Sequence, residues 1–128
     1  MALYHDLGES IIGDLVTGNH RFADISKEEK RKKESTAINA LSKESGLSEI
    51  YDLWQEMEEQ KTPEAITVKD FDVIDMLLQA FEYIQKYPKA ERLEKFMENN
   101  ESDVKTDLGK RLVAEIKSAQ EEFLRENV

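Results

Sequence analysis

His5 and Asp6 are adjacent residues whose side chains could bind one metal ion. They lie in the segment MALYHDLGESIIGD. The pair offers an imidazole nitrogen and a carboxylate oxygen, which together suit a divalent ion of the Mn, Fe, Co or Zn class. A metal site normally needs further protein ligands, so the elements that bring other polar side chains to this pair decide its chemistry.

The pair falls in a predicted helix over residues 2–12, which Gly13 is expected to end. At 100° per residue, His5, Asp6 and Glu9 share one side, and spacings of three and four residues let their side chains converge. Asp14 follows the helix stop and could fold back to the same place. The opposite, apolar side consists of Leu3, Tyr4, Leu7 and Ile11. On the His-Asp pair alone, an ordinary solvated helical face is the preferred interpretation.

A second predicted helix, from Thr62-Pro63 to Lys86, carries carboxylates within an apolar run. Its apolar residues lie on nearly every side, which predicts a buried helix: Phe71, Val73, Ile74, Met76, Leu77, Leu78, Ala80 and Phe81. A buried carboxylate needs a cation, a metal or hydrogen-bond donors. For Asp72, a metal ion and an ion pair with Lys69 are equally good alternatives, whereas for Asp75 a structural role is preferred.

The remaining basic and imidazole groups are read as surface residues. His20 lies in a polar loop beside Arg21, and the mixed charges of residues 27–34 (KEEKRKKE) are typical of a solvated helical face. Arg21, Lys27 and Lys30 could reach a phosphate, but exposed basic residues are common.

Four further helices complete an all-α prediction. They are expected over residues 26–43, 48–60, 90–98 and 103–126. Ser26 and Glu29 form a capping-box pattern at the start of the first, and Thr62 suits the N-cap of the helix that begins at Pro63. Two apolar faces are predicted: one of Leu47, Ile50, Trp54 and Met57, and one of Leu108, Leu112, Ile116, Ala119 and Phe123.

The amino-acid composition argues against several classes of binding partner. The 128 residues suffice for one domain, and a net charge of −10 argues against nucleic acid and anionic membranes as main partners. The absence of cysteine excludes disulfides and thiolate-bound metals. With no signal peptide and no long apolar span in the sequence, a soluble cytoplasmic protein is expected.

Several separated segments resemble HD-domain metal-dependent phosphohydrolases, in their 5′-deoxynucleotidase-like branch. They are Leu3–Glu9 (LYHDLGE), Ile12–Leu15 (IGDL), Leu53–Glu56 (LWQE), Val68–Asp72 (VKDFD) and Leu78–Ala80 (LQA). The resemblance implies an HD-type helical bundle over residues 1–128. It also implies hydrolysis of the 5′-phosphate of a (deoxy)nucleoside monophosphate.

The same resemblance implies residue roles. His5, Asp6 and Asp72 would be metal ligands, and Glu9 and Asp14 would be the additional acidic residues of the catalytic site. A second metal ion, Mg²⁺ among the candidates, would lie at Glu9, Asp14 and the backbone carbonyl of Leu15. Family members are often dimeric, so a homodimer is a further expectation.

Members of this family carry helices before the HD motif, and those helices supply another histidine ligand and substrate contacts. The chain is therefore expected to be an N-terminally truncated HD domain with apolar surface exposed on residues 2–12 and 63–86. Two alternatives stay open: a non-catalytic helical interaction module built on the HD scaffold, and an HD hydrolase of another phosphomonoester.

Overall fold

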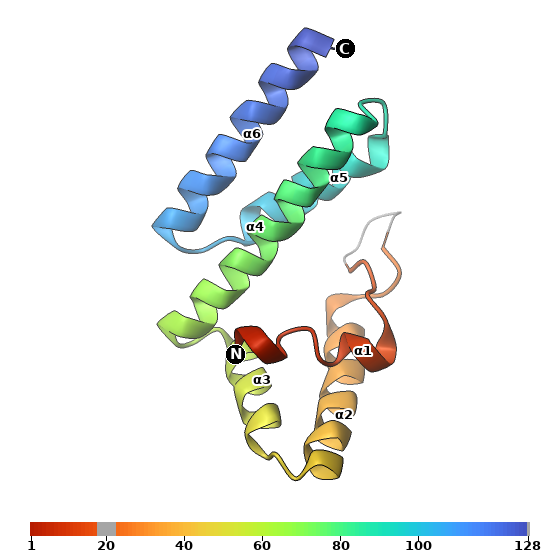
Figure 1. Cartoon of the computed structure of the whole chain (residues 1–128), viewed down its shortest axis with the longest axis vertical. Coiled ribbons are helices and arrows are strands. Elements are labelled where there is room, and N and C mark those ends of the chain that lie inside the picture. The colour runs from red at the N-terminus through yellow and green to blue at the C-terminus, as the bar shows by residue number, and fades with distance from the viewer. Residues whose placement is uncertain (18–22, 128) are drawn as a thin grey trace. The chain divides into compact units, whose positions relative to one another are not determined.

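The computed structural model describes residues 1–17 and 23–127, and every element named in Figure 1 is a helix. The α-helices are α1 (Glu9–Ile12), α2 (Lys27–Ser45), α3 (Glu49–Glu59), α4 (Pro63–Lys86), α5 (Glu91–Asn100) and α6 (Asp107–Asn127). Two short 3₁₀-helices are η1 (Ala2–Tyr4) and η2 (Glu101–Asp103). The all-α prediction is confirmed, since these described ranges contain no strand. None of their helices is long and apolar enough to cross a membrane.

The chain divides into two compact units, residues 1–65 and 66–128, with the boundary inside α4. In the first unit, α2 and α3 form a helical hairpin (Figure 1). The predicted capping box starts α2, because the Ser26 side chain accepts from the Glu29 amide while Glu29 accepts from the Ser26 amide. Thr62 likewise caps α4 by accepting from the Ala65 amide.

The interior of the first unit includes Ile38 of α2 and Ile50, Trp54 and Met57 of α3, all buried. Three of the four residues of the predicted face on α3 are therefore confirmed, whereas Leu47 is about half exposed. The ring of Trp54 lies 6.0 Å from that of Tyr51, centroid to centroid. Among the described residues, the buried Trp54 Nε1 has no hydrogen-bond partner.

The prediction of one α-helix over residues 2–12 is wrong. After η1, the chain continues through turns to α1, and hydrogen bonds such as Leu7 N to Tyr4 O and Glu9 N to Asp6 O join residues three apart. This 3₁₀-type path is tighter than an α-helix, so the 100° periodicity does not apply. As a result, Leu3 and Ile11 of the predicted apolar side are exposed. Gly13, with φ of 86°, ends α1 as predicted.

In the second unit, α4 and α6 lie side by side and run in the same direction. Between them in the chain, α5 runs in the opposite direction (Figure 1). The parallel direction agrees with an edge-on contact of Phe81 with Phe123 near the C-terminal ends of the two helices. Residues of α4, α5 and α6, together with Val104 from the segment before α6, form one core: Val73, Ile74, Leu77, Ala80, Ile84, Met97, Val104 and Ile116. Burying such side chains contributes about 1.5–3 kcal/mol each before the entropic cost of ordering them.

The start of α6 is fixed by Asp70 of α4. The Asp70 carboxylate accepts from the backbone amides of Lys105 and Thr106, at 2.8 and 2.7 Å, and from the Thr106 hydroxyl. Thr106 in turn caps α6 by accepting from the Gly109 amide at 3.0 Å. The predicted start of this helix at Asp103 is therefore corrected to Asp107.

Two predicted apolar surfaces differ from the observed ones. On α4, Phe71 and Leu78 are 49% and 45% exposed, so this helix is not apolar and buried on every side. On α6, Leu108 and Ala119 are exposed, while Gly109 and Ile116 are buried. Gly109 lies against the Asp70–Thr106 contacts, because a Cβ atom built on it would lie 2.7 Å from Asp70 Oδ2 and 2.9 Å from Thr106 Oγ1.

Candidate metal centre

His5 and Asp6 present their side chains to each other. His5 Nε2 lies 3.1 Å from Asp6 Oδ2, and the side chains are 30% and 59% exposed. Two ligand atoms that each lie about 2.0–2.2 Å from a metal ion, at angles near 90–109°, are separated by about 3–3.4 Å. The observed spacing therefore fits neighbouring ligands of one ion that solvent can reach.

The hydrogen bond of His5 Nδ1 determines whether Nε2 carries a proton or a lone pair that can bind a metal ion. His5 Nδ1 lies 2.6 Å from the Ala2 carbonyl oxygen, which can only accept, so Nδ1 carries the proton. Metal-binding histidines are commonly oriented by such a bond from the other ring nitrogen to a carbonyl oxygen. In the neutral ring the Nε2 lone pair then faces the Asp6 carboxylate. A metal ion placed between them could be bound by both the Nε2 lone pair and the Asp6 carboxylate.

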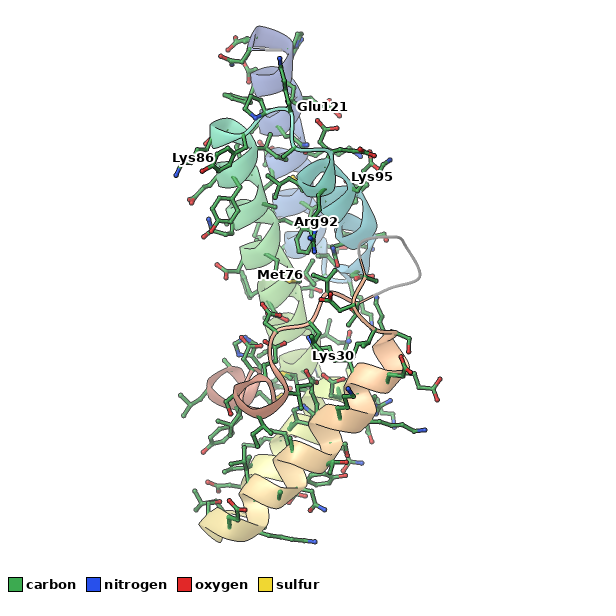
Figure 2. The ribbon with its side chains drawn as sticks, turned by 90° about the vertical axis from the view of Figure 1, so that its right-hand side faces the viewer. Lys30, Met76, Lys86, Arg92, Lys95 and Glu121 are labelled. Carbon is green, nitrogen blue, oxygen red and sulfur yellow. The ribbon has the colours of Figure 1, made fainter. Side chains whose placement is uncertain are left out.

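The Glu9 side chain forms an ion pair with a lysine of α2. Lys30 projects from the first turns of α2 (Figure 2). Its Nζ lies 2.7 Å from Glu9 Oε1 and 3.7 Å from Glu34 Oε1, and all three side chains are largely shielded from solvent. The solvated-face interpretation of Lys30 is therefore wrong for this member of the charged run. The charged run of residues 27–34 correctly predicted that Lys30 lies on a helix. It did not predict that Lys30 would form an ion pair with Glu9.

Lys30 keeps its charge in this setting. Burial alone lowers the pKa of Lys30, but the hydrogen bond to Glu9 and the charges of Glu9, Glu34 and Asp14 outweigh it, so the pKa is raised above the ordinary value. The side chain is therefore a fixed cation among acidic groups.

Asp14 and Leu15 lie in the segment that follows α1. Asp14 is exposed and Leu15 is partly buried. Two hydrogen bonds join Val16, the residue after Leu15, to Asp24. The Asp24 carboxylate accepts from the Val16 amide through Oδ2, and the Asp24 amide donates to the Val16 carbonyl. This pairing anchors the backbone immediately after Leu15.

The carboxylates of α4 differ from each other in environment. Asp72 is partly exposed and Asp75 is exposed. The buried one is Asp70, which the sequence analysis missed. Burial raises the pKa of the Asp70 carboxyl, but the Thr106 hydroxyl and the Lys105 and Thr106 amides outweigh it and hold the pKa below the ordinary value of 3.8. A signal was present, since Asp70 shares the three-and-four spacing of Val73, Leu77 and Ile84. His20 and Arg21 lie outside the described residues.

Comparison with known proteins identifies the family. A family model described as "HD domain" matches residues 1–112. The chain belongs to the HD-domain family. Membership implies binding of a divalent metal ion, and His5 and Asp6 are the adjacent His and Asp of this HD domain that offer ligand atoms.

The HD domain is similar to curated proteins named 5′-deoxynucleotidases. It is 43% identical to 5′-deoxynucleotidase HDDC2 of Dictyostelium discoideum, over 92% of this chain and 63% of that protein. It is 35% identical to 5′-deoxynucleotidase HDDC2 of Xenopus laevis, over 99% of this chain and 63% of that protein. For 5′-deoxynucleotidase YGK1 of Saccharomyces cerevisiae the identity is 37%, over 84% and 51%. The chain thus spans between about half and somewhat under two thirds of the length of these relatives.

Proposed function

We propose that this HD domain carries the metal site of a phosphohydrolase that releases phosphate from (deoxy)nucleoside 5′-monophosphates. The observation that carries the proposal is the His5–Asp6 geometry, in which Nδ1 is bonded to a carbonyl and Nε2 faces a carboxylate across a metal-sized gap. The similarity to proteins named 5′-deoxynucleotidases supports the reaction and the substrate class.

We propose His5, Asp6 and Asp72 as the protein ligands of a divalent ion of the Mn, Co, Fe or Zn class. Asp72 belongs to this set by its place in the VKDFD segment, which lies within the residues that match the family. A bound divalent ion lowers the pKa of a water molecule and neutralises phosphate charge, which a chain of net charge −10 otherwise repels.

Glu9 and Asp14 are proposed as the catalytic carboxylates. Glu9 accepts a hydrogen bond from Lys30 through Oε1, so its second oxygen can accept a proton or orient a water molecule. Asp14 is exposed and can reach a substrate from solvent. We further propose that residues 1–128 belong to one HD-type domain, because the family match covers residues 1–112 and so includes the first compact unit and most of the second. A homodimer and a cytoplasmic location stay predictions.

Metal analysis and a phosphate-release assay test the proposal. The purified chain is expected to bind a transition metal and to release phosphate from deoxynucleoside monophosphates. His5→Ala and Asp72→Asn should lower both metal content and activity. Asp75→Asn is the matched control for Asp72→Asn, since it removes an exposed carboxylate three residues along the same helix. The proposal fails if the chain binds no metal and its activity is unchanged by His5→Ala and Asp72→Asn.

A specific observation favours one alternative, a non-catalytic interaction module. Phe71 and Leu78, seven residues apart on α4, are about half exposed and fall on one side of that helix. If this module is the correct function, the chain should bind no metal while Phe71→Ser weakens association with a partner chain. A hydrolase of another phosphomonoester would instead retain metal and show higher kcat/KM for a non-nucleotide substrate in the same assay.

A further inference from the structure

Lys30 is surrounded by acidic groups from three places in the first unit. Its ammonium contacts Glu9 of α1 and Glu34 of its own helix, and the charge of Asp14 also acts on it. The Lys30, Glu9 and Glu34 side chains are only 18%, 21% and 11% exposed. Two shielded carboxylates require a nearby cation, and the chain supplies this cation itself.

The backbone at Gly8 holds this arrangement close to α2. A Cβ atom built on Gly8 would lie 3.2 Å from Cγ of Glu34, so the absence of a side chain permits the close approach. Glu9 follows directly, and its carboxylate meets Lys30 one turn before Glu34 on α2. The position of Glu9 is thus set by a close backbone contact on one side and by a hydrogen-bonded ammonium on the other.

We propose that Lys30 is a positioning residue for Glu9 and supplies the positive charge that a second metal ion would otherwise bring to Glu9, Asp14 and Leu15. This inference rests on the proposed function for the catalytic meaning of Glu9. A divalent ion that entered this position would have to displace the ammonium from a 2.7 Å contact. The site therefore works with one metal ion, at His5 and Asp6, and with a tethered cation at Glu9.

Metal counting on folded variants separates this role from that of a purely structural ion pair. The decisive comparison is made in a His5→Ala background, which removes the first metal site and makes the result independent of the proposed metal centre. Mn²⁺ titration followed by the electron paramagnetic resonance signal of free Mn²⁺ is expected to show no bound ion in His5→Ala. His5→Ala/Lys30→Met should bind one, with a dissociation constant on the order of 10⁻⁴–10⁻³ M, as for modest carboxylate sites.

Adding Glu9→Gln to the double variant should abolish the new site, and His5→Ala/Lys30→Arg should bind no Mn²⁺. Lys33→Met in the same background is the matched control, because it removes an exposed lysine of the same helix. The proposal is overturned if Lys30→Met gains no Mn²⁺ while circular dichroism shows it folded. It is equally overturned if His5→Ala alone already binds Mn²⁺ through Glu9.

Kinetics supply the second readout. In the otherwise unaltered chain, assayed with Mn²⁺ far below the dissociation constant of the new Glu9 site so that no ion replaces the ammonium, Lys30→Met should lower kcat by about 10-fold to 100-fold through misplacement of Glu9, with a much smaller change in KM. Lys30→Arg should recover part of the lost kcat, and Lys33→Met should leave both parameters unchanged. Equal losses in Lys30→Met and Lys30→Arg would contradict a positioning role. Absence of activity in the parent chain would instead refute the proposed function, and the Mn²⁺ counts would still decide the role of Lys30.

Discussion

Replacing Asp70 by alanine should destabilise the second unit more than any exposed substitution on α4. The Asp70 carboxylate accepts three hydrogen bonds from Lys105 and Thr106 and is only 3% exposed. Hydrogen bonds to a charged acceptor contribute roughly 1.5–3 kcal/mol each. Water can reach the freed amide of the exposed Lys105, so the loss falls below the full sum, and we expect about 3 kcal/mol.

Urea denaturation followed by far-ultraviolet circular dichroism measures this loss, with chelator present so that metal binding does not contribute. Asp75→Ala removes an exposed carboxylate of the same helix and should change the unfolding free energy by less than about 0.5 kcal/mol. A loss below about 1 kcal/mol for Asp70→Ala, with Asp75→Ala unchanged, would refute the stabilising role of the buried carboxylate.

The pH dependence of the same measurement has a definite sign. Because the folded protein holds the pKa of Asp70 below 3.8, its contribution is full above that value and is lost as the pH falls through the folded-state pKa. Asp70→Asn keeps the shape of the side chain but cannot ionise. The unfolding free energy of Asp70→Asn should therefore be lower than that of the parent chain at about pH 7, and the two values should approach each other at about pH 3. A constant gap across this range would contradict the assignment.

Three other substitutions or treatments have expected outcomes. Gly109→Ala should cost about 1–3 kcal/mol in urea denaturation, because the new Cβ would lie 2.3 Å from Val104 Cγ1 and 2.7 Å from Asp70 Oδ2. Gly8→Ala should lower activity more than stability, since its Cβ would press on Glu34 beside Lys30; a normal kcat would argue against this contact as a positioning element. Chelation of the metal should abolish phosphate release while leaving the helical circular dichroism signal nearly unchanged, and Mn²⁺ should restore activity.

Local signals in the sequence predicted the helices that have clear caps. Ser26 with Glu29, and Thr62 before Pro63, set helix starts to within a residue because their side chains bond to amides only a few positions away. The family assignment likewise followed from short segments around His5 and Asp72. Such signals depend on neighbouring residues, so the sequence contains them directly.

The missed features depend on residues far apart in the chain. Asp70 is satisfied by amides more than thirty positions later, and the pairing of Lys30 with Glu9 spans twenty-one. The tight path of residues 2–12 brings Gly8 close to Glu34, a contact that no periodicity encodes. Hydrophobic spacing predicts that a side chain faces inward, but the donor that meets a buried carboxylate is determined by the tertiary fold.

Trp54 makes the two compact units distinguishable by spectroscopy. It is the single tryptophan of the chain, is buried in the first unit, and has an indole N–H without a hydrogen-bond partner among the described residues. Its emission should be blue-shifted in the native protein and should shift to the red when the first unit unfolds. Far-ultraviolet circular dichroism records the helices of both units. Superimposable denaturation curves from the two probes would therefore indicate cooperative unfolding of the whole chain, and an earlier dichroism transition in Asp70→Ala would indicate that the second unit melts by itself.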